Sequence, residues 1–279
     1  MNKNIRKRNE SILVHTLAII SLLFILFPIY WLVISALQSP QTIISIPPSL
    51  LPRSFSLYFV KKVFAEFGIG RFLANSIFLS LGSTLLTLII ACFAAFSYTA
   101  YRYSLKESFS KLVLFVYMFP QILIIIPIYL LMSKVGLINT YGGLILCYIA
   151  FELPICIWTM QSYFATIPKD LIDAAEIDGL RRISTLWYVF LPVALPGLAA
   201  SGVMTFIGIW NNFLLANTLL IDEAKKTLPV VIADFASRDS MMQGDVLAAS
   251  LVVCIPSFFF ALFAQKYLVG GLTAGSVKA

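Results

Sequence analysis

The sequence predicts an all-α polytopic membrane protein with six transmembrane helices. Sixty per cent of its 279 residues are hydrophobic and only 12% are charged, against roughly 25% in a typical soluble domain. The mean hydropathy is +0.92. The charges are also spaced so that they leave runs as long as the ~20 residues that a membrane-spanning helix needs. These observations exclude an ordinary soluble protein and leave little length for a separate soluble enzyme domain.

The charge-free runs locate the spans, because a charged side chain at the bilayer centre costs at least ~2.5 kcal/mol. Trimmed at Pro, Gly and aromatic residues, the runs predict helices at 12–36, 73–99, 112–133, 143–163, 193–220 and 246–265. Within these helices, Pro120, Pro127 and Pro256 are expected to produce kinks.

The segments outside the spans complete the predicted domain organisation. We expect a cytoplasmic basic tail over 1–11, the first transmembrane helix over 12–36, an external loop over 37–70, a core of five helices over 71–266 and a cytoplasmic C-terminal tail over 267–279. The external loop should contain an amphipathic helix that lies at the membrane surface, because apolar residues alternate there with Lys61, Lys62 and Glu66.

The orientation follows from the basic N-terminal tail. Lys3, Arg6, Lys7 and Arg8 precede the first apolar run and favour a cytoplasmic N-terminus. An even number of spans then places both termini in the cytoplasm. The first apolar run is longer than the hydrophobic region of a secretory signal, so we expect it to remain as an anchor. The net charge of +7 is explained by this topology and requires no nucleic acid partner.

The residues needed for common catalytic sites are scarce. The four cysteines fall in predicted spans without paired spacing, and the chain has one histidine, so we expect neither a disulfide nor a metal site. The sequence contains no phosphate-binding GxxxxGK[ST] loop, no GxSxG elbow and no HExxH pair. These absences favour transport over catalysis, with no catalytic residues and no cofactor in this chain.

The connection between the fourth and fifth spans, residues 168–190, is predicted to be two short helices across a tight bend. Pro168 and Asp170 suit the first turn of a helix, and Gly179 suits the left-handed conformation that ends one. Acidic residues separated by small apolar ones, at Asp170, Asp173, Glu176 and Asp178, favour insertion into a groove on another protein. The alternative is a solvated loop that merely contains helix-forming residues.

This connection also carries a recognisable motif. Asp173-Ala174-Ala175-Glu176-Ile177-Asp178-Gly179, followed by Leu191-Pro192, resembles the EAAxxDG signature and later LP of the membrane subunits of ABC importers. Asp173 replaces the family's Glu, and Leu180 stands where Ala is usual. The resemblance implies the type I ABC importer permease fold, with Asp173, Ala174, Ala175, Asp178 and Gly179 coupling the subunit to an ATPase.

Three further segments resemble the carbohydrate branch of these importers. They are Trp210-Asn211-Asn212-Phe213-Leu214, which is similar to a WNEFL-like stretch, Thr227-Leu228-Pro229, and the tail from Gly271 to Lys278, which is similar to GLTAGAVK. With Asn75-Ser76, the resemblance covers roughly residues 70–279 and indicates a maltose-type sugar permease. Asn212 replaces the usual acidic residue, so a role of that charge does not transfer.

The resemblance implies several partners. They are a second homologous permease subunit forming a heterodimer, two ATPase subunits that use ATP and Mg, an extracytoplasmic sugar-binding protein, and membrane lipid. The implied location is the bacterial cytoplasmic (inner) membrane. The alternatives are a non-sugar ABC permease and a secondary transporter, although the latter more often has inverted repeats and several buried ionisable groups.

The candidate substrate path is defined by polar residues within the spans. Glu152 is the only carboxylate inside a predicted span, and a carboxylate at that depth is by default a functional candidate. Gln121, Trp210, Asn211 and Asn212 add the aromatic and amide groups that suit a sugar ring. Each also has a structural alternative, because a bundle-facing Glu can pair within the protein and Trp and Asn can hold helices together.

The acidic residues of the outer loop at 222–245 are a candidate contact for the binding protein, and solvation is the alternative for most of them.

Overall fold

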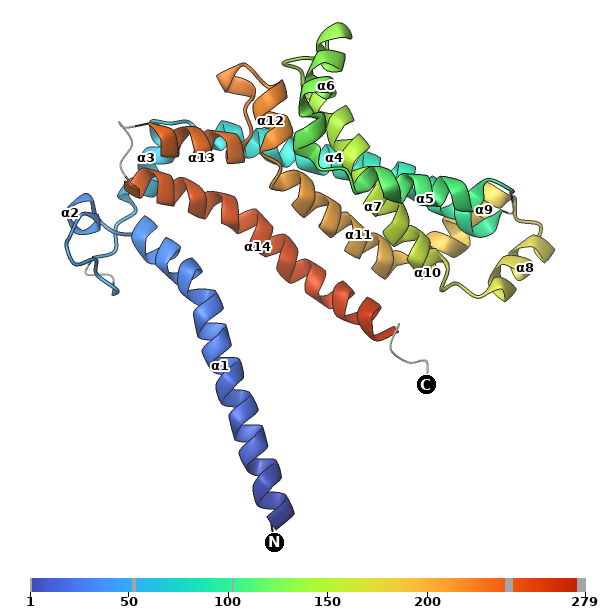
Figure 1. Cartoon of the computed structure of the whole chain (residues 1–279), viewed down its shortest axis with the longest axis horizontal. Coiled ribbons are helices and arrows are strands. Elements are labelled where there is room, and N and C mark those ends of the chain that lie inside the picture. The colour runs from blue at the N-terminus through green and yellow to red at the C-terminus, as the bar shows by residue number, and fades with distance from the viewer. Residues whose placement is uncertain (1, 52–53, 102, 239–242, 275–279) are drawn as a thin grey trace. The chain divides into compact units, whose positions relative to one another are not determined.

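The computed structural model describes residues 2–51, 54–101, 103–238 and 243–274, and every regular element within those ranges is a helix (Figure 1). The chain forms two compact units. The first contains residues up to 69 together with 232–254, and the second contains 70–231 together with the residues from 255 onward. The predicted all-α class is therefore confirmed, and each unit is described below by itself.

Four helices are long and apolar enough to cross a membrane. They are α1 (Asn2–Ala36), α4 (Ile69–Ala100), α7 (Tyr141–Phe164) and α14 (Gln243–Ala274), whose candidate spans cover Glu10–Ala36, Ile69–Ala100, Tyr141–Phe164 and Gln243–Leu262. The charge-free runs placed all four. The basic tail predicted over 1–11 is already helical from Asn2, and α14 runs on to Ala274 through part of the predicted C-terminal tail. Residues 275–279 of that tail lie outside the described residues.

The other two predicted spans are broken helices. α5 (Lys106–Tyr117) and α6 (Gln121–Lys134) meet at an angle of 97°, and the segment Ile183–Val193 meets α11 (Leu195–Trp210) at 82°. The span predicted at 112–133, with a kink expected at Pro120, is broken at that residue, because Pro120 has no N–H to continue the helix and restricts the residue before it. The helix predicted at 193–220 is also interrupted, since α12 (Leu214–Leu219) begins only after a break at 211–213. Counting each bent pair as one span gives six spans among the described residues.

The first unit packs an outer helix onto the start of α14. It contains α1, α2 (Pro40–Ile43), α3 (Tyr58–Ala65) and the end of α13 (Leu228–Ser237). α3 is the predicted amphipathic helix, but its apolar residues Phe59 and Val63 are fully buried and the Phe59 ring lies against Gly244. Phe59 and Val63 therefore pack on protein, whereas Leu57 and Phe64 remain exposed, and a position of this helix at the membrane surface stays a prediction. Lys62, on the same helix, forms an ion pair of 2.9 Å with Asp245.

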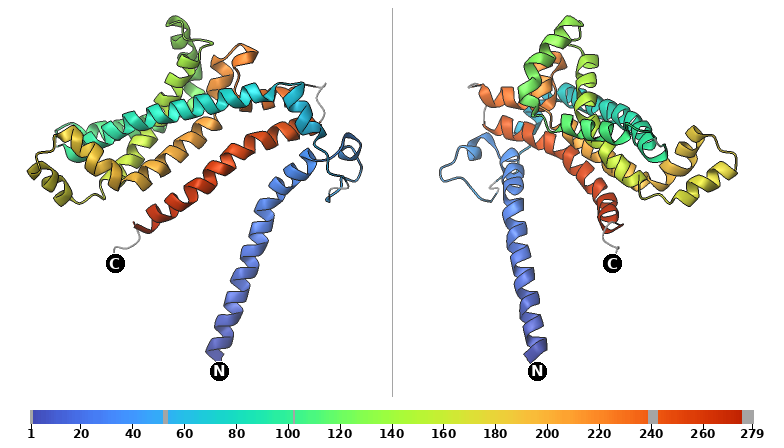
Figure 2. Two further views of the ribbon diagram at one scale, coloured as in Figure 1. Left: turned by 180° about the vertical axis from the view of Figure 1, so that it is seen from behind. Right: turned by 45° about the vertical axis from the view of Figure 1, so that its right-hand side comes forward.

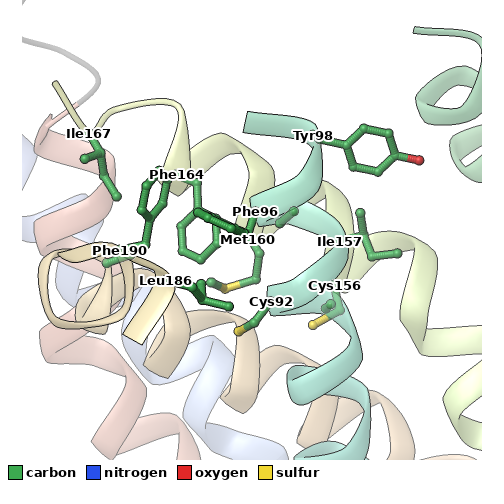
Figure 3. Packing of buried hydrophobic residues seen from close by; sticks show 13 residues of the cluster. Cys92, Phe96, Tyr98, Cys156, Ile157, Met160, Phe164, Ile167, Leu186 and Phe190 are labelled. Carbon is green, nitrogen blue, oxygen red and sulfur yellow. The ribbon is translucent and has the colours of Figure 1, made fainter. Parts of the chain in front are cut away.

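The second unit has two apolar clusters. α4 runs beside α11 (Figure 2), where the Leu88 side chain contacts Gly202. The first cluster joins α4 and α7 to the segment 186–194, and Figure 3 shows Phe190 beside Phe164 and Phe96 in it. The second cluster joins α7 and α12 through Leu144, Tyr148 and Leu215. These clusters fix the elements that carry the candidate site.

Candidate functional site

A cavity of about 440 Å³ lies in the second unit, beside the break between α5 and α6. Three predicted path residues line it: Gln121 begins α6, Glu152 lies within α7, and Asn212 follows α11. The complete lining is Val116, Tyr117, Phe119, Gln121, Ile124, Ile128, Ala150, Phe151, Glu152, Pro154 and Asn212. Residues up to 96 positions apart are thus gathered by the broken helix and the turn after α11.

Two amides in the cavity wall are bonded to each other. The Asn212 Nδ2 group donates to Gln121 Oε1 at 3.2 Å, and Asn212 Oδ1 accepts the backbone N–H of Leu215 at 3.1 Å. The second bond caps the start of α12, because side-chain oxygens commonly satisfy the first N–H groups of a helix. Asn212 is therefore held in place at both ends of its amide group.

Glu152 fits into the wall because the neighbouring helix has a glycine opposite it. A Cβ atom at Gly208 of α11 would lie 2.7 Å from Glu152 Oε1, so any larger residue would displace the carboxyl group. Among the described side chains, no salt bridge includes Glu152. The carboxyl group is therefore positioned by the packing of α7 against α11 and keeps its capacity for hydrogen bonds.

Trp210 and Asn211 do not line the cavity. Trp210 is 1% exposed and its ring stacks on Phe206 at a centroid distance of 5.6 Å. Asn211 Nδ2 donates to the Ile207 carbonyl at 3.0 Å and so helps to end α11. The structure thus brings together three of the five predicted path residues and places the other two at the end of α11, next to the turn that carries Asn212.

The aromatic rim of the cavity was missed by reasoning from sequence. Tyr117 and Phe119 are about half exposed, at 48% and 50%, and both line the cavity with Phe151. In a membrane sequence rich in Phe, these rings resemble lipid-facing residues. The available signal was Pro120, because a break at a proline turns the adjoining residues away from the regular helix surface.

The connection between α7 and α11 has the helix, turn and helix that were predicted. α8 (Lys169–Ile177) ends at Gly179, whose φ is +77°, and α9 (Arg182–Thr185) follows. The Leu180 N–H donates to the Ala175 carbonyl at 3.0 Å, which is the closing bond of a Schellman motif. Gly179 is favoured here because a Cβ atom makes a left-handed backbone costly.

The outer surface of this connection combines carboxylates with apolar groups. Asp173, Ala174, Asp178 and Gly179 are exposed, whereas Ala175 is buried beneath them. Ile177 is 86% exposed, and Ile183, Trp187 and Tyr188 are exposed as well. The side chain of Glu176 lies outside the described residues. We call residues 169–190 the coupling segment; its surface has the mixture of apolar anchors and charges that is common at protein interfaces.

The coupling segment is fastened to the second unit by aromatic packing. The Phe190 ring makes edge contacts with Phe96 of α4 at 4.9 Å and with Phe164 of α7 at 5.2 Å (Figure 3). Phe190 closes a single π-helical turn, Leu186–Phe190, which is followed by α10 (Leu191–Val193). Such turns are often found at functional positions in helices. Phe190 therefore packs the segment directly against α4 and α7.

A second ordered connection, residues 220–228, lies at the N-terminal ends of α4 and α7, whereas the coupling segment follows the C-terminal end of α7. Asn139, with φ of 58°, accepts the N–H groups of Ile221 and Asp222 through Oδ1 at 3.1 and 3.0 Å. Hydrogen bonding by the Asn139 amide and then by Lys225 lowers the pKa of Asp222 below its ordinary value. This part of the acidic outer loop is thus an organised turn.

The same connection is fixed by the start of α4. Asn75 Nδ2 donates to the carbonyls of Ala224 and Lys226 at 2.9 and 3.0 Å, and Ser76 Oγ accepts the Leu228 N–H at 2.7 Å. Asn75-Ser76 and Thr227-Leu228-Pro229, noted separately in the sequence, therefore form one structural feature.

Comparisons with known proteins agree on a single family. The family described as "Binding-protein-dependent transport system inner membrane component" matches residues 87–272, more than half of the chain. The trehalose/maltose transport system permease protein MalG of Thermococcus litoralis is 34% identical over 264 residues, covering 94% of each chain. The sulfoquinovosyl glycerol transport system permease protein SmoH of Agrobacterium fabrum is 31% identical over 253 residues, covering 91% of this chain and 89% of that one.

A solved structure shares the fold. A chain of a bacterial ABC transporter involved in the import of the acidic polysaccharide alginate superimposes with a TM-score of 0.81 at 24% identity, over 94% of this chain and 97% of that chain. The predicted permease fold is therefore confirmed.

Proposed function

Since the chain belongs to the family of inner membrane components of binding-protein-dependent transport systems, we propose that it is the permease subunit through which an ABC importer moves a sugar or oligosaccharide into the cell. The observation that carries this proposal is the similarity, along nearly the whole chain, to a permease of a trehalose/maltose transport system. The cavity with a carboxyl group, two amides and an aromatic rim supports it, because such groups bind polyhydroxylated rings.

The proposed complex has a division of labour. This subunit pairs with a second, homologous permease subunit, and together they enclose the path. Two ATPase subunits bind ATP with Mg on the cytoplasmic side, and an extracytoplasmic binding protein delivers the sugar. Both termini of this chain are cytoplasmic. The chain supplies no ATPase site of its own, in keeping with its lack of a phosphate-binding loop.

The coupling segment is the proposed docking site for an ATPase subunit. Its exposed apolar residues, Ile177 above all, fit a cleft in the partner, and Asp173 and Asp178 set the orientation at the rim. Ala174 and Ala175 allow close approach, and the Gly179 turn holds α8 at a fixed angle to the following residues. When the ATPase subunits close on ATP, α8 moves with them, and Phe190 transmits this motion to α4 and α7.

The sugar path runs past the cavity at the break in the α5 and α6 pair. Glu152, Gln121 and Asn212 contact the sugar, while Trp210 and Asn211 hold the end of α11 so that Asn212 remains in the wall. Discontinuous helices near the middle of a membrane are a recurrent way to present backbone and side-chain groups to a transported solute.

A charge reversal in the coupling segment tests the proposal. The complex is purified with its ATPase and binding protein, and uptake of labelled sugar into proteoliposomes is measured. The double variant Asp173→Lys with Asp178→Lys should release the ATPase from the detergent-solubilised complex and abolish uptake, because repulsive or unmatched charges at a docking rim lower affinity. The isolated chain should not hydrolyse ATP.

The control reverses the same number of charges elsewhere, with Glu66→Lys and Glu107→Lys at exposed positions, and should retain both partners and uptake. If the coupling variant still recovers the ATPase undiminished and still transports sugar, residues 168–190 are an ordinary loop. If no sugar is taken up by the wild-type complex, the proposed substrate class is wrong.

A further inference from the structure

We infer that the cavity in the second unit accepts saccharides that carry no acidic group and rejects acidic ones, and that Glu152 is the residue that sets this selectivity. The inference rests on the proposed function, because it assumes that the transported sugar passes this wall. It adds the chemical class of the substrate, which the family does not fix: a transporter of the acidic polysaccharide alginate shares this fold.

The first observation is the charge of the lining. Among the described residues that surround the cavity there is no Lys, Arg or His, and Glu152 is the only charged type. A carboxylate or sulfonate on a sugar would lose part of its hydration on entry without meeting a cation in this wall. Leaving such a charge unmatched is far more costly than leaving a hydroxyl group with one hydrogen bond fewer.

The second observation is that the acidic group has a fixed position. The Glu152 carboxyl lies against Gly208, with no room for a side chain there, and α7 and α11 are held together by buried residues on both sides of the contact. A ligand cannot displace the carboxyl toward α11. An acidic sugar would therefore lie close to a like group, whereas a hydroxyl or an ammonium group can donate to it.

The rest of the wall suits a neutral polyol. Gln121 and Asn212 present amide groups, which can donate and accept, and a hydrogen bond of 3.2 Å holds the two amides side by side. Tyr117 and Phe119 offer apolar ring surfaces to the C–H face of a sugar. None of these groups requires a charge on the ligand.

The backbone does not reverse this preference. The C-terminal end of α5 and the N-terminal end of α6 meet at the cavity, at Tyr117 and Gln121. These ends carry opposite partial charges of similar size, so their effects on an anion offset one another. Glu152 is therefore the acidic group that a ligand meets in the described lining, where no cationic side chain lies beside it.

Direct ligand binding to the complex of permease and ATPase subunits tests this selectivity, because the binding protein, which would select sugars itself, is left out. The purified complex is placed in lipid nanodiscs and examined by saturation-transfer NMR. The neutral probes are maltotriose and cellotriose, the acidic probe is trigalacturonic acid and the cationic probe is the glucosamine trimer. We expect signals from a neutral probe and from the cationic probe, with the acidic probe weaker by about tenfold or more, since like charges in contact cost at least ~1.4 kcal/mol.

Two variants separate charge from shape. Glu152→Gln keeps the size and a capacity for hydrogen bonds but removes the acid, so the ratio of acidic to neutral binding should rise by about tenfold. Gly208→Ala retains the acid and displaces it, so neutral binding should weaken while the acidic probe remains excluded. Glu107→Gln, which removes an exposed carboxylate outside the cavity, should leave every ratio unchanged.

Equal binding of the acidic and neutral probes by the wild-type complex would overturn the inference, and so would an unchanged ratio in Glu152→Gln. The proposed function would survive either result as long as proteoliposomes still take up a sugar. If a sugar is transported but no probe gives a signal that depends on Glu152 or Gly208, the sugar does not contact this wall and the inference fails alone. If no sugar is transported, both fail.

Discussion

At the scale of single residues, the ion pair between Lys62 and Asp245 shows what charge patterning can miss. Asp245 is fully buried at the start of α14, and the Lys62 side chain is 16% exposed. In the sequence, Asp245 is one of several acidic residues of a predicted outer loop. For most of these residues, solvation is the alternative to a contact with the binding protein. The partners are 183 positions apart, so no local pattern could pair them.

We predict that Lys62→Met destabilises the first unit strongly. The Lys62 ammonium group lies 2.9 Å from a fully buried carboxylate, and removing one partner of a buried ion pair typically costs about 3–5 kcal/mol. The matched variant Lys61→Met, at an exposed neighbour, should change stability by less than ~0.5 kcal/mol. Thermal unfolding of the detergent-solubilised protein measures both, and equal losses would contradict the assigned pairing.

The pH dependence of this pair has a definite sign. Hydrogen bonding to Asp245 raises the pKa of Lys62 above its ordinary value of 10.5. The stabilisation is therefore complete below the ordinary pKa of the unfolded chain and is lost only as pH rises through the raised value. Stability near neutral pH should consequently be insensitive to titration of Lys62.

Gly179 is the residue whose role the sequence indicated most directly. Its φ of +77° agrees with the expectation of a left-handed helix end. We predict that Gly179→Val lowers sugar uptake by about tenfold while the chain still inserts, because a β-branched residue in this conformation costs about 1–2 kcal/mol and alters the angle of α8.

Gly142→Val serves as the control, because Gly142 has an ordinary helical φ and space for a side chain. Normal uptake and normal sugar-stimulated ATPase activity in Gly179→Val would show that the turn is not needed for coupling.

At the scale of elements, the sequence located the spans and the bend at Pro120, but neither the size of that bend nor the break at 211–213. Hydropathy depends on composition along the chain, so a helix that bends by 97° at Pro120 gives nearly the same profile as a straight one. The break at 211–213 was harder still to predict, because it is stabilised by a tertiary bond between Asn212 and Gln121, 91 positions apart. The coupling segment was predicted well because its signals are local: an N-terminal Pro and Asp, and a C-terminal Gly.

The connection at 220–228 yields a prediction about local order. The double variant Asn75→Ala with Ser76→Ala removes three hydrogen bonds, two to the carbonyls of Ala224 and Lys226 and one from the Leu228 N–H. With about 1 kcal/mol for each bond, hydrogen exchange of the Leu228 amide should accelerate by at least about tenfold. Ser80→Ala, one turn along α4, is the comparison variant and should leave this exchange unchanged. Identical exchange in the two variants would mean that the connection is ordered by other contacts.

At the scale of the whole molecule, the candidate site depends on the path of the chain through space. Glu152 could be selected from the sequence because a carboxylate in an apolar span is conspicuous. The sequence could not identify its neighbours Gly208, Tyr117 and Phe119 as part of the site, because these residues come together with Glu152 only in the folded chain. Trp210 was selected for its chemistry, yet its burial against Phe206 gives it a packing role.

The orientation of the whole chain gives the last prediction. The coupling segment and Ser237 should lie on opposite sides of the membrane, since the proposed topology places the former in the cytoplasm and the latter outside. Single variants Ile177→Cys and Ser237→Cys are prepared in a background without Cys92, Cys147, Cys156 and Cys254, so that only the introduced thiol reacts. Both positions are exposed, so access depends on the side of the membrane and on bound partners.

An impermeant thiol reagent applied to intact cells should label only Ser237→Cys. In inverted membranes it should label Ile177→Cys, and the labelling should fall when the ATPase subunits are bound, because Ile177 is then covered. Ser237→Cys provides the control for an effect of the ATPase that does not involve contact. Labelling of both positions from outside would refute the six-span topology, whereas labelling of Ile177→Cys that the ATPase leaves unchanged would refute docking at the coupling segment while leaving the topology intact.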